Sequence, residues 1–161
     1  MTIVIQCIRI QYRKGECAVL SGVLREINRA WISIDERLFL WNYEDGRDFC
    51  VYDGVEQVIV GVALVPAKRD AALFVDAVRY LLLVATPVEL VVLAVTFAHD
   101  PVNGELSLHP TPLSQPSDNA LFVSMAATAD GRVFLAAADG HLYELTYAPD
   151  DSWLFSTRPL K

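Results

Sequence analysis

The sequence predicts an all-β protein built from blades of the β-propeller type. An apolar run, an Asp-Gly turn and a second run with aromatic residues occur in residues 37–52 and again in residues 132–145, which is a β-hairpin written twice. The strand cores at Leu38, Leu81 and Val133 are 43 and 52 residues apart, close to the period of about 40–50 residues of propeller blades. The 161 residues therefore hold roughly three blades.

The strands are apolar on both faces, which is the third sign of this fold. Leu38, Phe39, Leu40 and Trp41 follow one another, although alternate side chains of a strand point to opposite faces. Helices cover both faces of a parallel sheet, but no helical periodicity follows residue 28. Both faces of each sheet must then be buried by packing against other sheets, as the blades of a propeller pack against one another.

The first 29 residues differ from the rest. Residues 1–12 alternate loosely, which favours a strand, and residues 19–28 favour a short helix. Residues 1–29 hold five basic and two acidic residues, a net +3, whereas residues 30–161 hold eight basic and eighteen acidic residues, a net −10. We expect residues 1–29 to be a divergent, irregular or helical N-terminal segment and residues 30–161 to form the blades.

From residue 30 onward the pattern is that of strands separated by turns. The expected strands span residues 30–34, 37–42, 48–52, 57–65, 80–86, 88–97, 106–108, 121–128, 132–137, 141–147 and 153–155. Five glycines follow Asp or Asn, and such dipeptides favour the positive φ of hairpin turns: Gly46, Gly54, Gly104, Gly131 and Gly140. Longer loops are expected over residues 66–76 and over the proline-rich residues 100–119, which leave room for one edge strand.

An open set of three blades leaves apolar faces uncovered at its ends. The sequence therefore looks like an incomplete propeller, a fragment of a longer protein. We expect the isolated chain to self-associate or precipitate through its end blades.

Residues 80–98 approach the length of a membrane span, with a single charge in nineteen residues. Glu89 stands at the centre, where a charge costs about 2.5–3.5 kcal/mol, and Pro87 and many β-branched residues interrupt helical structure. The segment is predicted to form two buried strands that turn at Pro87.

Composition excludes several classes of protein. With 53% hydrophobic and 20% charged residues, the chain has the material for a packed core and is not mainly disordered. Its net charge of −7 disfavours a nucleic-acid or anionic membrane surface as partner. Three cysteines without a Cys-x-x-Cys pair, Cys7, Cys17 and Cys50, favour neither disulfides nor zinc, and indicate a reducing compartment. No signal-peptide pattern opens the chain.

Candidate chemical groups lack the context that a reaction needs. His99, His109 and His141 show no His-x-x-x-His spacing, and no Gly-x-Ser-x-Gly occurs. A polar loop position is therefore the better interpretation of His99, and His141 is expected on the solvent side of its hairpin. Residues 100–105 resemble a calcium loop but lack alternating oxygen ligands. The acidic pairs at residues 35–36, 44–45 and 150–151 lie in expected turns, where solvation explains them.

Three further residues have competing interpretations. Cys50 lies in an expected strand, which favours a buried apolar role over a nucleophile. Trp41 and Tyr43 could anchor a partner, because aromatic residues dominate interface hot spots, or they could pack between blades. The sequence therefore assigns no catalytic, cofactor-binding or metal-ligating residue, no cofactor and no small-molecule substrate.

Many segments resemble one family in register. They are Arg29-Ala30-Trp31-Ile32-Ser33-Ile34-Asp35, Leu38-Phe39-Leu40-Trp41-Asn42-Tyr43-Glu44-Asp45-Gly46, Tyr52-Asp53-Gly54, Val78-Arg79-Tyr80-Leu81-Leu82, Leu83-Val84-Ala85-Thr86-Pro87-Val88-Glu89, Pro112-Leu113, Pro116-Ser117-Asp118-Asn119, Gly131-Arg132-Val133-Phe134-Leu135-Ala136 and Asp139-Gly140-His141-Leu142-Tyr143-Glu144. The chain resembles here the large non-repetitive, WGA-negative nucleoporin of the nuclear pore inner ring, over roughly residues 22–155. Residues 1–20 do not match this family.

The resemblance implies an N-terminal seven-bladed β-propeller, of which this chain would be the first blades, followed by a C-terminal α-solenoid. It implies a structural constituent of the nuclear pore complex at the nuclear envelope, supporting transport of protein and RNA. The implied partners are other scaffold nucleoporins, with pore-membrane contact through family regions beyond residue 161 and no direct contact with nucleic acid. No residue of this chain matches a membrane-contacting loop.

Two other hypotheses remain open from the sequence. One is a propeller-type enzyme or ligand-binding module whose site lies in blades outside this chain. The other is a generic cytosolic protein-interaction propeller, against which the absence of the common Trp-Asp repeat signature counts.

Overall fold

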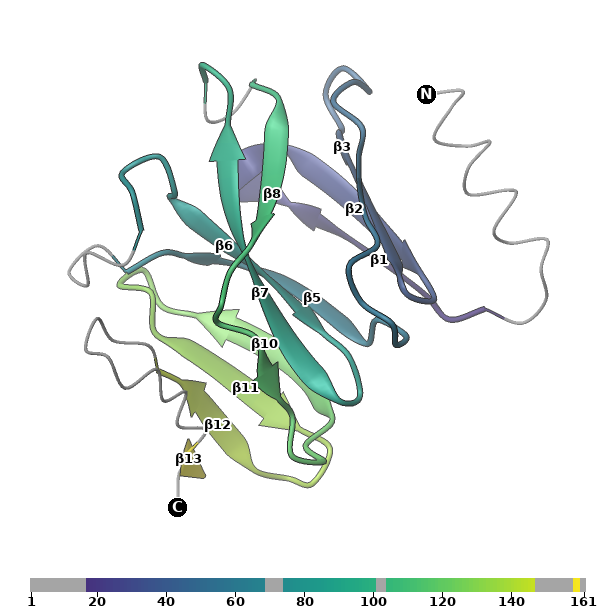
Figure 1. Cartoon of the computed structure of the whole chain (residues 1–161), viewed down its shortest axis with the longest axis vertical. Coiled ribbons are helices and arrows are strands. Elements are labelled where there is room, and N and C mark those ends of the chain that lie inside the picture. Colours follow the sequence, from purple (N-terminus) through teal and green to yellow (C-terminus); the bar gives the residue numbers. More distant parts are fainter. Residues whose placement is uncertain (1–16, 69–73, 101–103, 147–157, 160–161) are drawn as a thin grey trace. The chain divides into compact units, whose positions relative to one another are not determined.

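The chain forms three antiparallel sheets, each with its main strands in chain order (Figure 1). The structure, a computed structural model, describes residues 17–68, 74–100, 104–146 and 158–159. The first sheet holds β1 (Val19–Leu24), β2 (Arg29–Ile34), β3 (Arg37–Asn42) and β4 (Cys50–Tyr52). The second holds β5 (Gly61–Pro66), β6 (Tyr80–Ala85), β7 (Glu89–Phe97) and β8 (Leu106–Pro110), with β9 (Gln115–Pro116) paired to β7. The third holds β10 (Phe122–Ala127), β11 (Val133–Ala137), β12 (Leu142–Leu145) and β13 (Arg158–Pro159).

The prediction of an all-β, partial β-propeller is confirmed. Three four-stranded antiparallel ladders in chain order are what three blades require. Within the described residues the helical structure is one 3₁₀ turn, η1 (Arg25–Ile27). The chain divides into two compact units, Met1–Ile59 with Phe97–Ser107, and Val60–Thr96 with Leu108–Lys161.

The predicted helix over residues 19–28 is wrong, because most of this stretch is strand. β1 pairs with β2 over its whole length, from Val19 opposite Ile34 to Leu24 opposite Arg29. The short η1 follows and ends at Asn28, whose φ of 51° turns the chain into β2. The predicted strands at residues 1–12 and 153–155 lie outside the described residues. The division at residues 29 and 30 stays a prediction.

Most other strand predictions are confirmed within a few residues, and two starts differ for local reasons. The strand expected from residue 57 begins at Gly61, because Ile59 donates its N–H to the carbonyl of Asp35 (2.8 Å) instead of joining the β5–β6 ladder. The strand expected from residue 48 begins at Cys50, because Asp48 has a φ of 51°, which an extended strand does not allow. The proline-rich loop contains the expected edge strand, β8, and also the two-residue β9.

The doubled hairpin of the sequence corresponds to β3–β4 and β11–β12. Both connections exceed a two-residue turn, at residues 43–49 and 138–141. Gly46 (φ 69°) and Gly140 (φ 84°) adopt the left-handed conformation that the Asp-Gly dipeptides predicted. At Gly54 that prediction is wrong, because its φ is not positive. A Cβ there would lie 2.6 Å from the hydroxyl oxygen of Tyr52, so the Tyr52 side chain would have to shift.

Gly131 combines a left-handed backbone (φ 78°) with close neighbours, since a Cβ there would lie 3.0 Å from the carbonyl oxygen of Pro66. Gly131→Ala is expected to lower the free energy of unfolding by about 2–4 kcal/mol, from backbone strain plus crowding. Gly46→Ala is the matched control, because Gly46 is left-handed with open space around it and should lose only about 1–2 kcal/mol. Urea titration measures both, and equal losses would contradict the role of crowding.

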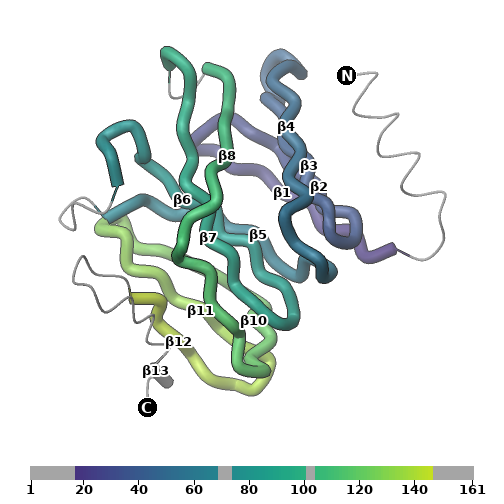
Figure 2. The backbone as a smooth tube through the Cα atoms, viewed as in Figure 1, coloured from purple at the N-terminus to yellow at the C-terminus, as the bar shows by residue number. Residues whose placement is uncertain are grey.

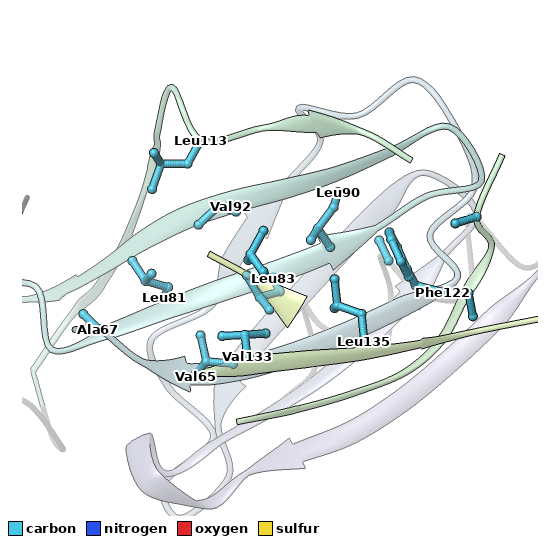
Figure 3. Close-up of a cluster of buried hydrophobic side chains, with 14 of the residues drawn as sticks. Val65, Ala67, Leu81, Leu83, Leu90, Val92, Leu113, Phe122, Val133 and Leu135 are labelled. Carbon is cyan, nitrogen blue, oxygen red and sulfur yellow. The ribbon is translucent and has the colours of Figure 1, made fainter. Parts of the chain in front are cut away.

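The second unit has a continuous apolar core. Figure 3 shows side chains of β5, β6 and β7 gathered in one cluster with those of β10 and β11. Figure 2 shows the backbone of these strands. The whole run from Leu81 to Ala85 is fully buried, so β6 is covered on both faces. The two-sided apolar pattern of the sequence is thereby explained. The core members, all buried, include Val65, Leu81, Leu83, Leu90, Val92, Leu113, Phe122, Val133, Leu135 and Leu145.

The long apolar stretch of the sequence forms β6 and β7, as predicted. The strands pair from Tyr80 opposite Val95 to Ala85 opposite Leu90. Thr86 closes the turn, because its N–H donates to the carbonyl of Glu89 (2.9 Å) and its Oγ1 accepts from the N–H of Glu89 (3.1 Å). Glu89 thus lies at a turn, half-buried. In the described part of the chain, no helix has the length and apolar character to cross a membrane.

Candidate functional site

The histidines lie apart from one another in loops and at a strand edge. His99 is exposed in a left-handed turn (φ 68°), and exposed His109 has its Nε2 2.8 Å from Thr96 Oγ1. His141 is on the solvent side, as predicted, with its Nδ1 3.2 Å from Asp139 Oδ2. Among the described residues, no three His, Cys, Asp or Glu side chains are grouped in a way that could hold a metal.

The acidic pairs that the structure describes stabilise turns. Asp35 Oδ1 accepts from the N–H of Ala18 (3.0 Å), and Asp45 Oδ1 accepts from the N–H of Arg47 (2.9 Å). The calcium-like stretch turns through a bond from the N–H of Gly104 to the carbonyl of Asp100 (2.8 Å), while residues 101–103 and the pair at 150–151 lie outside the described residues. The sequence explained the acidic pairs by solvation alone, whereas Asp35 and Asp45 also accept backbone hydrogen bonds.

Cys50 is a half-buried thiol in β4. Burial, and secondarily the negative charge of Asp48, raise the pKa of this thiol above its ordinary value. A raised pKa leaves less thiolate at neutral pH, and the thiolate is the reactive form. The local environment therefore disfavours a nucleophilic role for Cys50.

In the folded chain at neutral pH, Cys50 is expected to react with a disulfide reagent more slowly than in the urea-unfolded chain, because its folded-state pKa is raised and the thiolate fraction falls. The folded rate should keep rising as the pH increases past the ordinary thiol pKa. Mass spectrometry of the labelled peptide reports the rate. Equal rates in folded and unfolded chains would contradict the assigned environment.

The turn after β3 presents an aromatic ring on a fixed backbone. Tyr43 is 42% exposed, and its hydroxyl donates to Asn28 Oδ1 (3.0 Å). Asn42 holds the turn, since its Oδ1 accepts from the N–H of Glu44 (2.8 Å) and its carbonyl accepts from the N–H of Gly46 (2.9 Å). Tyr43 is thus ordered yet accessible, which suits a partner contact. Trp41 is half-buried, and its alternative roles stay predictions.

The turn after β11 has a similar hydrogen-bonded design. Asp139 accepts from the Tyr143 hydroxyl (2.7 Å) and from the His141 N–H (2.9 Å). The bond from Tyr143 is the largest cause that lowers the pKa of the Asp139 carboxyl, and the same bond raises the pKa of Tyr143. The Tyr143 ring also meets Phe122 edge-on at 5.8 Å. These groups fix the hairpin and leave no acid–base pair aimed at a cavity.

The most buried charge in the described chain is Arg29, which has 0% exposure at the start of β2. Its Nη2 donates to Asp48 Oδ2 (2.6 Å) and to the carbonyl of Gly104 (2.8 Å). Its Nε donates to Asp48 Oδ2 (3.0 Å), and its Nη1 donates to the carbonyl of Ile27 (2.9 Å). We call this set of contacts the Arg29 clamp.

The other half of the Arg29 clamp centres on Asp48, whose side chain is 15% exposed. Its two oxygens lie 3.1 and 3.0 Å from the backbone nitrogen of Leu106, which donates to them. The Arg29 guanidinium also lies 5.7 Å from the centre of the Phe97 ring, within range of a cation–π contact. Sequence reasoning missed this clamp. Asp48 and Gly104 follow Arg29 by 19 and 75 positions, and such separations form no recognisable motif.

A second ion pair lies on the third sheet and is largely solvated. Arg132 Nε donates to Glu144 Oε1 (2.7 Å), and Arg132 Nη2 donates to Glu144 Oε2 (3.0 Å). The guanidinium also lies 5.1 Å from the centre of the Phe134 ring. Since more than half of the Arg132 side chain is exposed, water screens this pair. It therefore serves as a control for the buried clamp.

Apolar side chains reach solvent in both units. In the first unit they lie on the two edge strands β1 and β4, and in the second unit Val123 (61% exposed) lies on β10. Such positions are typical of surfaces that contact further protein. The exposed apolar strand and turn residues of these two sheets include Val19, Leu20, Val23, Val51, Leu121, Val123 and Leu142.

A hollow of about 290 Å³ lies in the second unit, between the end of β5 and residues 74–79. Its charged lining residues are Lys68, Asp76 and Arg79. These three groups do not form a nucleophile with an adjacent base, which a hydrolytic or transfer site would require.

The comparisons with known proteins agree with one another. The family model described as Nup133 N terminal like matches residues 6–161. The match includes residues 6–20, for which the sequence predicted none. The chain is similar to nuclear pore complex protein Nup154 of Drosophila melanogaster, at 40% identity over 143 residues, which cover 88% of this chain and 10% of that protein. It is similar to nucleoporin NUP170 of Saccharomyces cerevisiae, at 36% identity over 138 residues, which cover 84% of this chain and 9% of that protein.

One solved structure shares the fold over nearly the whole chain. It is the Chaetomium thermophilum Nup170 NTD in complex with Nup53, with a TM-score of 0.80 and 32% identity, covering 95% of this chain and 22% of that one. The chain spans about a tenth of the length of the curated relatives named above.

Proposed function

The chain belongs to the Nup133 N-terminal-like family of nucleoporins, and on this premise we propose that it is a structural constituent of the nuclear pore complex. Its role is that of a β-propeller scaffold segment of the inner ring at the nuclear envelope, supporting transport of protein and RNA. The observation that carries the proposal is the family-model match to residues 6–161, together with relatives that are nuclear pore proteins.

The local chemistry supports a scaffold over an enzyme. Asp45 and Asp139 accept hydrogen bonds within turns, and Arg29 and Arg132 form ion pairs with carboxylates. The pKa of the Cys50 thiol is raised above its ordinary value. A catalytic site would instead bring a nucleophile, a base and an oxyanion donor to one place. The protein is therefore proposed to be non-enzymatic.

The proposed partners are other scaffold nucleoporins. The Nup170 NTD of Chaetomium thermophilum was solved in complex with Nup53, which supports a Nup53-type nucleoporin as one partner of this chain. The rigidly held Tyr43 and the exposed apolar residues of β1 and β10 are the surfaces proposed to make such contacts. Residues 30–161 are proposed to form the blades together with Arg29 and β1, which pairs with β2 in the first sheet.

Proximity labelling in cells tests the proposal. A biotin ligase fused to the full-length protein is expected to enrich nucleoporins over the same ligase fused to a nuclear localisation signal alone. Enrichment of metabolic enzymes without nucleoporins would favour the enzyme hypothesis and contradict the scaffold role. Enrichment of cytosolic assemblies alone would favour a generic interaction propeller instead.

A further inference from the structure

We infer that the first sheet and the backbone around Gly104 and Leu106 form one discontinuous cooperative unit, which folds and opens as a block under the control of the Arg29 clamp. Phe97–Ser107 holds the last residue of β7 and the first two residues of β8. It nevertheless belongs to the same compact unit as Met1–Ile59, although 37 residues of the other unit, Val60–Thr96, lie between them in sequence. The clamp supplies a physical reason for this grouping, because its contacts join the two stretches.

The buried charge of Arg29 requires the second stretch. Two of its acceptors, Asp48 and Ile27, belong to the first stretch, but the carbonyl of Gly104 belongs to the second. A guanidinium with 0% exposure is strongly destabilised when its donors are left unpaired. The native position of Arg29 is therefore favourable only after Gly104 has docked.

Asp48 makes the dependence mutual. Its carboxylate compensates the charge of Arg29 and also accepts the N–H of Leu106. If Leu106 moves away, the two carboxylate oxygens of Asp48 lose their backbone N–H donor. If Arg29 moves away, the same carboxylate loses its counter-ion. Each stretch thus stabilises the other through the same two side chains, which is the condition for joint opening.

This arrangement fixes an order of events in the growing chain. The strands β1 to β4 are the first to be made, but the clamp that completes their unit needs residues 104–106, which follow β5, β6 and β7 in the sequence. The unit of the first sheet is therefore completed only after β5, β6 and β7 have been made.

Native-state hydrogen exchange of the full chain tests the inference. With increasing sub-denaturing urea, the amide of Leu106 is expected to follow the same opening free-energy curve as the amides of Phe39 and Leu40 in β3. The amides of Leu82 and Leu83 in β6 should follow a separate curve. If Leu106 follows the β6 amides, or exchanges independently of β3, the inference is wrong.

A variant gives a second, independent arm. Arg29→Met is expected to speed exchange at Leu106 and in β3 by one shared factor of about a hundredfold or more, the size expected for breaking a buried ion pair. Exchange in β6 should change less. Arg132→Met, which removes the solvated pair of the third sheet, should leave Leu106 and β3 unchanged. A change at Leu106 alone, or an equal change at all these amides, would overturn the inference.

Discussion

Arg29→Met is expected to lower the free energy of unfolding by about 3–5 kcal/mol, measured by urea titration of the full chain. The reason is the charge left behind: Asp48 keeps its carboxylate at 15% exposure without its counter-ion, and the carbonyl of Gly104 loses its donor. Removing one partner of a buried pair costs far more than the pair contributes as a whole.

The double variant Arg29→Met with Asp48→Asn isolates this cause. Asparagine tolerates the left-handed φ of 51° at position 48 and can still accept the N–H of Leu106, while no buried charge remains. The double variant should therefore recover part of the free energy of unfolding that Arg29→Met alone loses. If the double variant lowers the free energy of unfolding by the sum of the two single-variant losses, charge compensation is not the cause. Arg132→Met should cause a smaller change, because the Arg132 side chain is 55% exposed and water can take its place beside Glu144.

Leu83→Ala is expected to lower the free energy of unfolding by about 2–5 kcal/mol. Leu83 has 0% exposure in the middle of β6, within the core shared by β5, β7, β10 and β11, as Figure 3 shows. Since the strand is hydrogen-bonded on both sides, its backbone cannot easily move to fill the cavity. The cost should therefore lie toward the upper part of this range.

Two comparisons check the core assignment. Leu83→Met conserves volume and should cost less than about 1.5 kcal/mol. Leu142→Ala removes a side chain that is 42% exposed on β12 and should cost much less than Leu83→Ala. If Leu142→Ala and Leu83→Ala were equally destabilising in the same urea titration, the placement of the core would be contradicted.

Strand periodicity and turn dipeptides were sufficient to predict most of the fold. The strand at residues 37–42 was predicted with its observed bounds, and β6 and β7 with the turn at Pro87 follow the pattern as expected. The error at residues 19–28 has a physical reason, because the stretch has no strong helical or strand pattern and its structure is set by pairing with β2. Similarly, β9 has only two residues and depends on its partner β7.

The candidate site shows where a sequence gives no signal. Gly46 and Gly140 could be predicted because their conformation is local. The Arg29 clamp could not be predicted, because it depends on contacts between residues that are distant in sequence. Arg29 contacts Asp48, and both contact the backbone near Gly104 and Leu106. A lone arginine before a strand is more often solvated than buried, so only the fold shows its role.

The measurement that tests the account most directly is the location of the protein in cells. The protein is tagged with a fluorescent label at its own locus and imaged together with an established pore marker. A scaffold nucleoporin should give a punctate rim at the nuclear envelope that coincides with the marker. A diffuse cytosolic signal, or an organelle pattern without the rim, would contradict the assignment of this chain to the pore scaffold.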